Sequence, residues 1–109
     1  MLKPIALHIL LALAERDSHG YGVMLTIRTQ SNGQVPVQTA SFYRHLARLI
    51  DEGLVAEAPA RRESVDPRRG TYYRITARGR QVLAAEKRRL TELVAQMNKV
   101  RLTPRKADA

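Results

Sequence analysis

Cysteine is absent from this chain of 109 residues, which excludes disulfides and any zinc or iron–sulfur site held by thiolates. No glycine-rich phosphate loop occurs, and the three histidines form no convincing constellation with carboxylates. The sequence therefore predicts no enzyme, no metal site and no cofactor.

Long hydrophobic runs are also missing, because the most apolar stretch spans only residues 5–14 and is too short to cross a bilayer. Such a stretch could be the apolar part of a signal peptide. However, a single lysine precedes it, Pro4 stands early, and its removal would take away much of the apolar residue supply. We interpret it as a buried first helix of a cytoplasmic, nucleoid-associated protein without a membrane partner.

Acidic residues are few, since ten Asp and Glu oppose 19 Lys and Arg and leave a formal charge of +9. Arginine supplies 15 of these 19 cations. The charge is consistent with a polyanionic partner. A basic balance can also serve solubility alone, so the positions of the arginines must decide between the two interpretations.

Helical periodicity fills the first half of the chain. Apolar spacing predicts a helix from Pro4 to about Arg16, a second helix capped by Ser18, and a third over residues 38–52. An Asn-Gly turn within residues 31–36 separates the last two helices. The predicted core-facing residues are Leu2, Ile5, Ile9, Leu10, Leu13, Val23, Met24, Ile27, Phe42, Leu46, Leu49 and Ile50.

Two glycines, Gly20 and Gly22, stand at the start of the second helix. Glycine in a helix costs about 1 kcal/mol relative to alanine. We expect these two either to admit close approach of another helix or to be ordinary glycines of a helix start.

The period changes from helical to alternating after Gly53, which can end the third helix in a left-handed conformation. Residues 54–58 and 71–76 alternate as strands, and the stretch between them holds two prolines and four arginines. Strand, basic loop and strand predict a hairpin wing.

A long last helix is predicted after Thr76, because no proline follows until residue 104 and no glycine follows Gly79. We expect about 23 to 26 helical residues. The predicted divisions are a winged helix-turn-helix DNA-binding domain (1–76), a C-terminal dimerisation helix (77–102) and a flexible tail (103–109).

The apolar residues of this last helix extend further than a small domain can cover, which favours a partner helix. Glu86 interrupts the stripe and weakens a strict coiled-coil interpretation. The alternative is packing on the chain's own first helix. The candidate dimerisation residues are Leu83, Leu90, Leu93, Val94 and Met97.

Together these elements predict a mainly helical fold with a small β-hairpin, the winged helix-turn-helix. The outward face of its third helix suits the major groove, where hydroxyl and amide groups bind base edges and arginine binds guanine. An ordinary solvated helix face is the alternative. The candidate recognition residues are Gln38, Thr39, Ser41, Tyr43, Arg44, His45 and Arg48.

The basic wing, residues 59–71, can clamp phosphates or enter a narrow minor groove. A loop with solubilising charge is the alternative. Tyr72 and Tyr73 point to opposite faces of a strand, so we expect one in the core and the other partly exposed. The candidate wing residues are Arg61, Arg62, Arg68, Arg69 and Tyr72.

Three segments carry a family resemblance: ILLALAERDSHGYGVMLTI at 9–27, SFYRHLARLIDEGLV at 41–55 and DPRRGTYYRITARGRQVL at 66–83. In their order and content the chain resembles the PadR-like transcriptional regulators. That family usually enters its recognition helix with a Gly-Thr-Leu-Tyr-like sequence. Here Ala40, Ser41, Phe42 and Tyr43 stand at those positions, which keeps a hydroxyl and an aromatic residue but loses the glycine.

The resemblance implies a homodimeric, usually repressing protein that binds double-stranded DNA at a pseudo-palindromic operator, with the C-terminal helix making much of the dimer. It also implies a possible small-molecule effector, here unidentified. The chain has no tryptophan and five aromatic residues, so an aromatic-sandwich site lacks its obvious residue. The alternative function is a winged-helix protein-interaction module without specific DNA binding.

Overall fold

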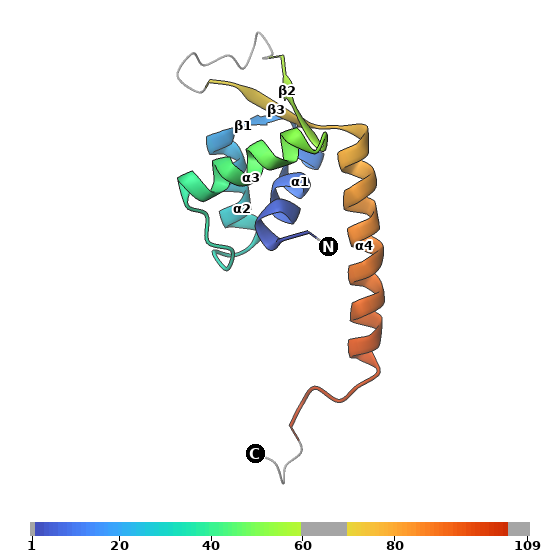
Figure 1. The fold of residues 1–109 in the computed structure, drawn as a ribbon. Coiled ribbons are helices and arrows are strands. Elements are labelled where there is room, and N and C mark those ends of the chain that lie inside the picture. The colour runs from blue at the N-terminus through green and yellow to red at the C-terminus, as the bar shows by residue number, and fades with distance from the viewer. Residues whose placement is uncertain (1, 60–69, 105–109) are drawn as a thin grey trace.

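The computed structural model describes residues 2–59 and 70–104. Within them, the helices are α1 (Pro4–Glu15), α2 (Gly20–Gln30), α3 (Thr39–Asp51) and α4 (Ala77–Asn98), and the strands are β1 (Ser18–His19), β2 (Val55–Ala58) and β3 (Tyr72–Ile75). Figure 1 shows α1, α2 and α3 packed together beneath the sheet, with α4 beside them. The predicted winged helix-turn-helix with a long C-terminal helix is confirmed.

One hydrophobic core joins α1, α2 and α3 to the base of the sheet. Phe42 of α3 and Ile9 of α1 are completely buried, as is Ile27 of α2. Full burial of such a side chain stabilises the fold by about 1.5–3 kcal/mol. Nine of the twelve predicted core residues are buried, whereas Leu2, Ile5 and Ile50 are only half-buried at its margin. The core also contains five residues that were not predicted: Ala6, Ala12, Leu54, Val55 and Ile75.

The cap of α2 differs from the prediction. His19, not Ser18, is the N-cap residue, and its Nδ1 atom accepts a hydrogen bond of 2.9 Å from the backbone N–H of Gly22. Ser18 is instead drawn into the sheet, where it pairs with Tyr73. This makes His19 the last extended residue before the helix, which is the position from which a side chain can cap.

The sheet has three strands rather than the predicted two. Their order is β1-β3-β2, and all pairs are antiparallel. Val55 pairs with Ile75 at the base of the β2–β3 hairpin, and Ala58 pairs with Tyr72 further out. A strand of two residues is too short to show alternation in a sequence, which is why β1 was not predicted.

The junction between α3 and α4 is held by two hydrogen bonds of the Thr76 hydroxyl. Gly53 has a positive φ of 76° and ends α3, as predicted. The hydroxyl of Thr76 donates to the carbonyl oxygen of Gly53 at 2.7 Å and accepts from the N–H of Gly79 at 3.0 Å. Thr76 therefore caps α4 and ties its start to the end of α3.

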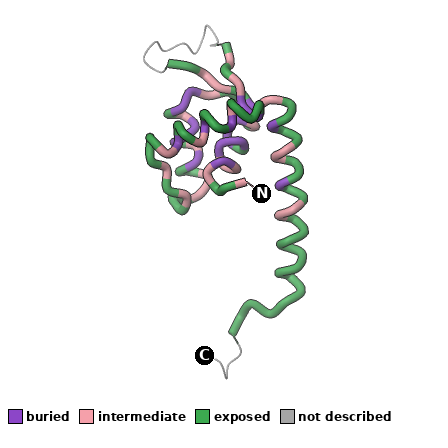
Figure 2. The backbone as a smooth tube through the Cα atoms, viewed as in Figure 1, coloured by how far each residue is buried: buried purple, intermediate pink, exposed green. Residues whose placement is uncertain are grey.

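Helix α4 ends at Asn98, four residues before the predicted boundary at residue 102. Its first half packs on the core, whereas its second half projects away and is exposed (Figures 1 and 2). The radius of gyration is 17.1 Å, compared with about 13 Å for a compact chain of this length. The excess reflects the projecting helix.

Gly79 provides a test of this junction. A Cβ atom at this position would collide with the carbonyl oxygen of Leu54 and lie 2.7 Å from Cγ1 of Ile75. We expect Gly79→Ala to lower the free energy of unfolding by about 1–3 kcal/mol, although alanine favours helices, because the backbone of Leu54 must shift. Urea denaturation measures the change. Arg78→Ala, at the exposed neighbouring position, should stay within about 0.5 kcal/mol; a Gly79→Ala variant as stable as the parent would contradict the tight contact.

Candidate nucleic-acid interface

Helix α3 presents one face to the core and the opposite face to solvent. Phe42, Leu46 and Leu49 fix it on the core. The exposed positions on the outer face are Ala40, Arg44, Ala47 and Asp51, spaced by three or four residues. Because alanines precede and follow Arg44 on this face, its guanidinium has free access to an approaching surface.

One flank of α3 is closed by Tyr43. A Cβ atom on Gly20 would lie 2.5 Å from the Tyr43 hydroxyl, so a larger residue there would have to displace the ring where it meets the start of α2. This confirms the close approach expected at Gly20. Burial raises the pKa of Tyr73 in β3, and Tyr43 and then Glu57 add to the effect. Tyr43 therefore lies in the seam between α3, α2 and the sheet, with 43% of its surface exposed.

The other flank of α3 faces the start of α1. Lys3, His45, Arg48 and Glu52 line a hollow of about 230 Å³ between the two helices. The Nε atom of Arg48 lies 3.5 Å from Oε1 of Glu52, and both side chains are exposed. Burial lowers the pKa of His45, and the positive charges of Lys3, Arg44 and Arg48 lower it further. Protonation of this imidazole is therefore disfavoured beside the three cations.

The remaining predicted residues of α3 lie at its start. Gln38 is the N-cap residue, yet its side chain makes no capping hydrogen bond, so its amide can reach another partner. Thr39 is exposed and Ser41 is half-buried. The structure therefore brings the predicted recognition residues onto one helix, but spreads them over its outer face and both flanks.

Arg28 belongs to the same surface, although sequence reasoning missed it. Its Nη2 atom donates to the carbonyl oxygen of Val37 at 3.5 Å, and its side chain is exposed. Arg28 lies on α2, and only the turn after that helix brings it beside the start of α3. The helical pattern of α2 gives no signal for this placement.

Most of the predicted wing residues, namely Arg61, Arg62, Arg68 and Arg69, lie outside the described part of the chain. Tyr72 is half-buried at the root of the wing, and its ring meets that of His19 edge to face at 5.5 Å. Tyr73 is also half-buried but packs against the core. Arg74 of β3 is exposed, and alternation with Tyr72 could have identified it as a wing residue.

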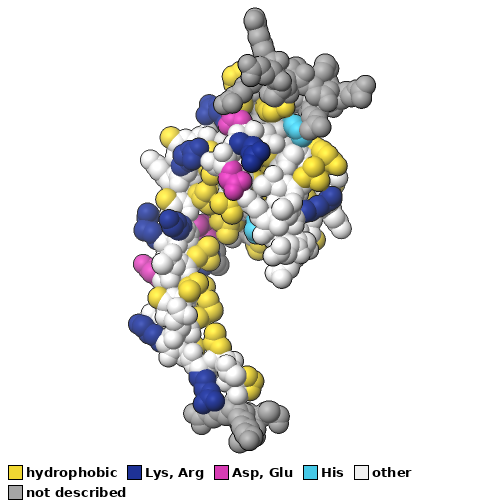
Figure 3. Space-filling view, turned by 180° about the vertical axis from the view of Figure 1, so that it is seen from behind, with side chains coloured by type: hydrophobic (Ala, Val, Ile, Leu, Met, Phe, Trp, Pro, Cys, Tyr) yellow, Lys and Arg dark blue, Asp and Glu magenta, His cyan; other side chains and the backbone are white. Residues whose placement is uncertain are grey.

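The predicted dimerisation residues form part of an apolar stripe on α4. Figure 3 shows apolar side chains along one side of this helix and Lys and Arg side chains on the other. Leu83 and Leu90 are half-buried, whereas Leu93, Val94 and Met97 are 47%, 49% and 40% exposed. The stripe is thus covered near the core and open beyond it.

A groove of about 610 Å³ separates α1 from α4. Its apolar lining comes from Leu7 and Leu11 of α1 and from Leu83, Leu90 and Val94 of α4, and its basic lining from Arg80 and Lys87. His8 also lines the groove, and among the described residues its Nδ1 atom has no hydrogen-bond partner.

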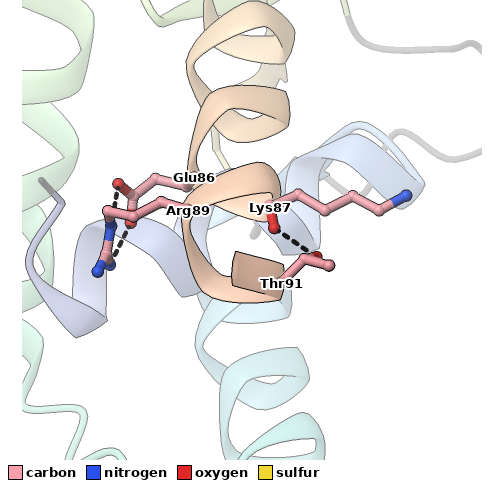
Figure 4. A network of polar contacts seen from close by, with 4 residues as sticks. All are labelled: Glu86, Lys87, Arg89 and Thr91. Carbon is pink, nitrogen blue, oxygen red and sulfur yellow. Dashed lines mark hydrogen bonds and ion pairs between the residues drawn. The ribbon is translucent and has the colours of Figure 1, made fainter. Parts of the chain in front are cut away.

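Glu86, which interrupts the apolar stripe in the sequence, is buried against the start of α1. Its two carboxylate oxygens accept hydrogen bonds of 3.0 and 2.9 Å from Arg89, as Figure 4 shows. The hydrogen bond from Arg89 lowers the pKa of Glu86, and a backbone hydrogen bond from Leu2 lowers it further. Glu86 therefore lies where α4 packs against the start of α1.

Two kinds of site are missing from residues 2–59 and 70–104. No group of three or more His, Asp or Glu side chains there could hold a metal ion. In the same ranges, no helix has both the length and the apolar composition that a membrane span requires.

A helix that is fixed on the core and carries exposed arginines, next to a small antiparallel sheet, is typical of winged helix-turn-helix proteins. The model of the transcriptional regulator PadR-like family matches residues 9–85, more than two thirds of the chain. The chain therefore belongs to the PadR-like family of transcriptional regulators. No curated protein sequence matches it.

Solved structures agree with this assignment. A transcriptional regulator from Clostridium thermocellum is 26% identical, with a TM-score of 0.70 over 86% of this chain and 89% of the other. A PadR family transcription regulator from Clostridium difficile is 21% identical, with a TM-score of 0.74 over 89% and 97%. The transcriptional regulator BldR from Sulfolobus solfataricus is 24% identical, with a TM-score of 0.67 over 94% and 65%. The last two show a shared fold only.

The electrostatics of the α1–α3 flank can be tested without a ligand. We expect the ring protons of His45 to titrate in NMR spectra with a midpoint below the ordinary value of 6.5. Lys3→Ala should raise this midpoint, because one of the cations that oppose protonation is removed. Lys99→Ala, at the far end of α4, should leave it unchanged. An unaltered midpoint in Lys3→Ala would show that Lys3 does not lie beside the imidazole.

Proposed function

We propose that the protein is a sequence-specific DNA-binding regulator, acting as a repressor, that binds a pseudo-palindromic operator as a homodimer. The observation that carries this proposal is the outer face of α3, where Arg44 stands exposed between two alanines on a helix fixed by the core. The basic charge of the chain and its membership of the PadR-like family support it.

In this proposal α3 lies in the major groove. Arg44 reads a base edge, since its guanidinium can bind guanine at two positions, and Gln38, Thr39 and Ser41 contact bases or phosphates near the start of the helix. Arg48 lies on the flank and contacts the sugar-phosphate backbone. Phosphate contacts fix the register of the helix, and base contacts supply the preference for one sequence.

The dimer uses the open half of the α4 stripe. Leu93, Val94 and Met97 leave an apolar surface that the chain itself does not cover, with the half-buried Leu90 at its edge, and a second copy would bury this surface. A two-fold symmetric dimer of this kind places its two recognition helices about 34 Å apart, which is one turn of duplex DNA, or a multiple of that distance. The operator must therefore have the same two-fold symmetry.

Release by a small molecule is part of the same proposal. The α1–α4 groove has a volume of about 610 Å³, which lies within the range of about 300–1,000 Å³ usual for small-molecule sites. Its lining is mainly apolar and also includes the cations Arg80 and Lys87 and the imidazole of His8. A compound bound there would touch both the proposed dimer helix and the DNA-binding domain.

The deciding experiment is a fluorescence-anisotropy titration of the protein against DNA from upstream of its own gene and against a scrambled duplex, at two salt concentrations. We expect tight, salt-sensitive binding that prefers the upstream DNA. Arg44→Ala should remove about 1–3 kcal/mol of that preference. Arg88→Ala, an exposed arginine of α4, is the matched control and should not change it.

Other outcomes have definite meanings. Equal losses on both duplexes in Arg44→Ala would remove its role in base reading. Weak and equal binding by the unaltered protein would argue against specificity for the upstream DNA. No binding even at low salt would contradict the proposal and favour the protein-interaction module.

The dimer makes a separate prediction. Leu90→Glu places a charge in the apolar stripe, so we expect monomers in sedimentation equilibrium and an operator affinity lower by on the order of a hundredfold, because two linked contacts become independent. Ala95→Glu introduces the same charge at an exposed position on the opposite face of α4 and should remain dimeric. A dimeric Leu90→Glu variant with full operator affinity would show that this stripe is not the interface.

A further inference from the structure

The two flanks of α3 face different parts of the molecule. Tyr43 marks the flank that faces β3, whereas His45 and Arg48 mark the flank that faces the start of α1. A helix in the major groove, which is about 12 Å wide, has a sugar-phosphate backbone on each side. In such a complex, strand β3 lies on the side of one backbone, and the start of α1 lies on the side of the other.

We propose that Lys3, with Arg48 and His45, forms a binding site for one backbone phosphate of duplex DNA, on the side of α3 opposite strand β3. This inference rests on the proposed function and adds to it a contact from α1, which lies outside the predicted recognition helix and wing.

The hollow between α1 and α3 has the size and charge that such a contact needs. Its volume is about 230 Å³, and two cationic side chains, Lys3 and Arg48, converge on it beside the imidazole of His45. Lys3 is exposed and makes no ion pair with any described residue. The hollow also contains Glu52, but this carboxylate is engaged by Arg48 at 3.5 Å. This contact is made by Nε of Arg48, so the other N–H donors of the guanidinium can bind a phosphate while Glu52 stays paired.

The start of α1 adds to the positive potential. Lys3 is the N-cap residue, its side chain makes no capping hydrogen bond, and the first turn holds no acidic residue. The first backbone N–H groups of a helix have no partner within the helix and carry a partial positive charge. These groups support the lysine ammonium and do not constitute a site without it.

The backbone next to Lys3 lies against α4. Glu86 of α4 binds the backbone of Leu2, the residue before it, and is itself fixed by two hydrogen bonds to Arg89. The backbone of Lys3 is therefore positioned by α4, and only its side chain has to be ordered on binding. Less conformational entropy is lost than for a lysine on a free end of the chain.

The test measures operator affinity as a function of salt for the unaltered protein and for Lys3→Ala, Lys3→Arg and Lys99→Ala. Each lost phosphate contact makes the slope of log K against log salt less steep by about 0.9, or about 1.8 for a dimer, which lowers the affinity on the order of 50-fold at 0.1 M salt. We expect this change for Lys3→Ala, on operator and scrambled duplex alike. Lys3→Arg keeps the charge and should restore the slope, and Lys99→Ala should keep it.

Ethylation interference locates the contact. Ethylation of one phosphate in each half-site should weaken binding by the unaltered protein but have no further effect on Lys3→Ala. Thermal unfolding followed by circular dichroism checks that the variants are folded, as expected for a change at an exposed side chain.

A Lys3→Ala variant that is folded and binds with the parental slope and the parental interference pattern would overturn this inference while leaving the proposed function intact. Failure of the unaltered protein to bind any duplex would overturn both. Whether the unaltered protein binds DNA therefore distinguishes failure of this inference from failure of the proposed function.

Discussion

The seating of α3 on the core is the constraint on which the rest of the structure depends. Phe42, Leu46 and Leu49 are buried against α1 and α2, and this burial fixes the rotation of the helix about its own axis. Because side chains of a helix recur every 3.6 residues, fixing one face fixes the other. The exposed position of Arg44 and the placement of Tyr43 and His45 on opposite flanks are consequences of what the core accepts.

Helix α4 follows from the same constraint, since its start is tied to the end of α3 through Thr76 and Gly79. Its first half is held by the core and by Glu86 at the start of α1, and its second half projects without cover. A rigid helix that is fixed at one end carries any movement of its free end back to the junction. Helix α4 thus connects the proposed dimer surface with the end of α3 and with the start of α1.

Much of the fold could be read from the sequence because it rests on local rules. Apolar spacing predicted the helices and most of the helical core, and Gly53 and Thr76 predicted the end of α3 and the start of α4. The errors arose where pairing partners lie far apart in the chain. Strand β1 forms because Ser18 and His19 pair with the edge of β3. As a result, the N-cap of α2 is His19, one residue after the predicted Ser18. The end of α4 at Asn98 also escaped the pattern, since apolar residues continue to Leu102.

The sequence by itself determined which side chains face inward, where the chain turns and that its surface is basic, because periodicity, glycine conformation and charge belong to the residues themselves. It also predicted that Arg44 and Arg48 point outward, because the spacing of the apolar residues in their helix identifies the opposite face. Only the tertiary structure decided that Lys3 of α1 and Arg28 of α2 lie beside α3, and that Glu86 serves this chain's own α1. Contacts between segments far apart in sequence follow from how the helices pack, and packing depends on the shapes of all of them together.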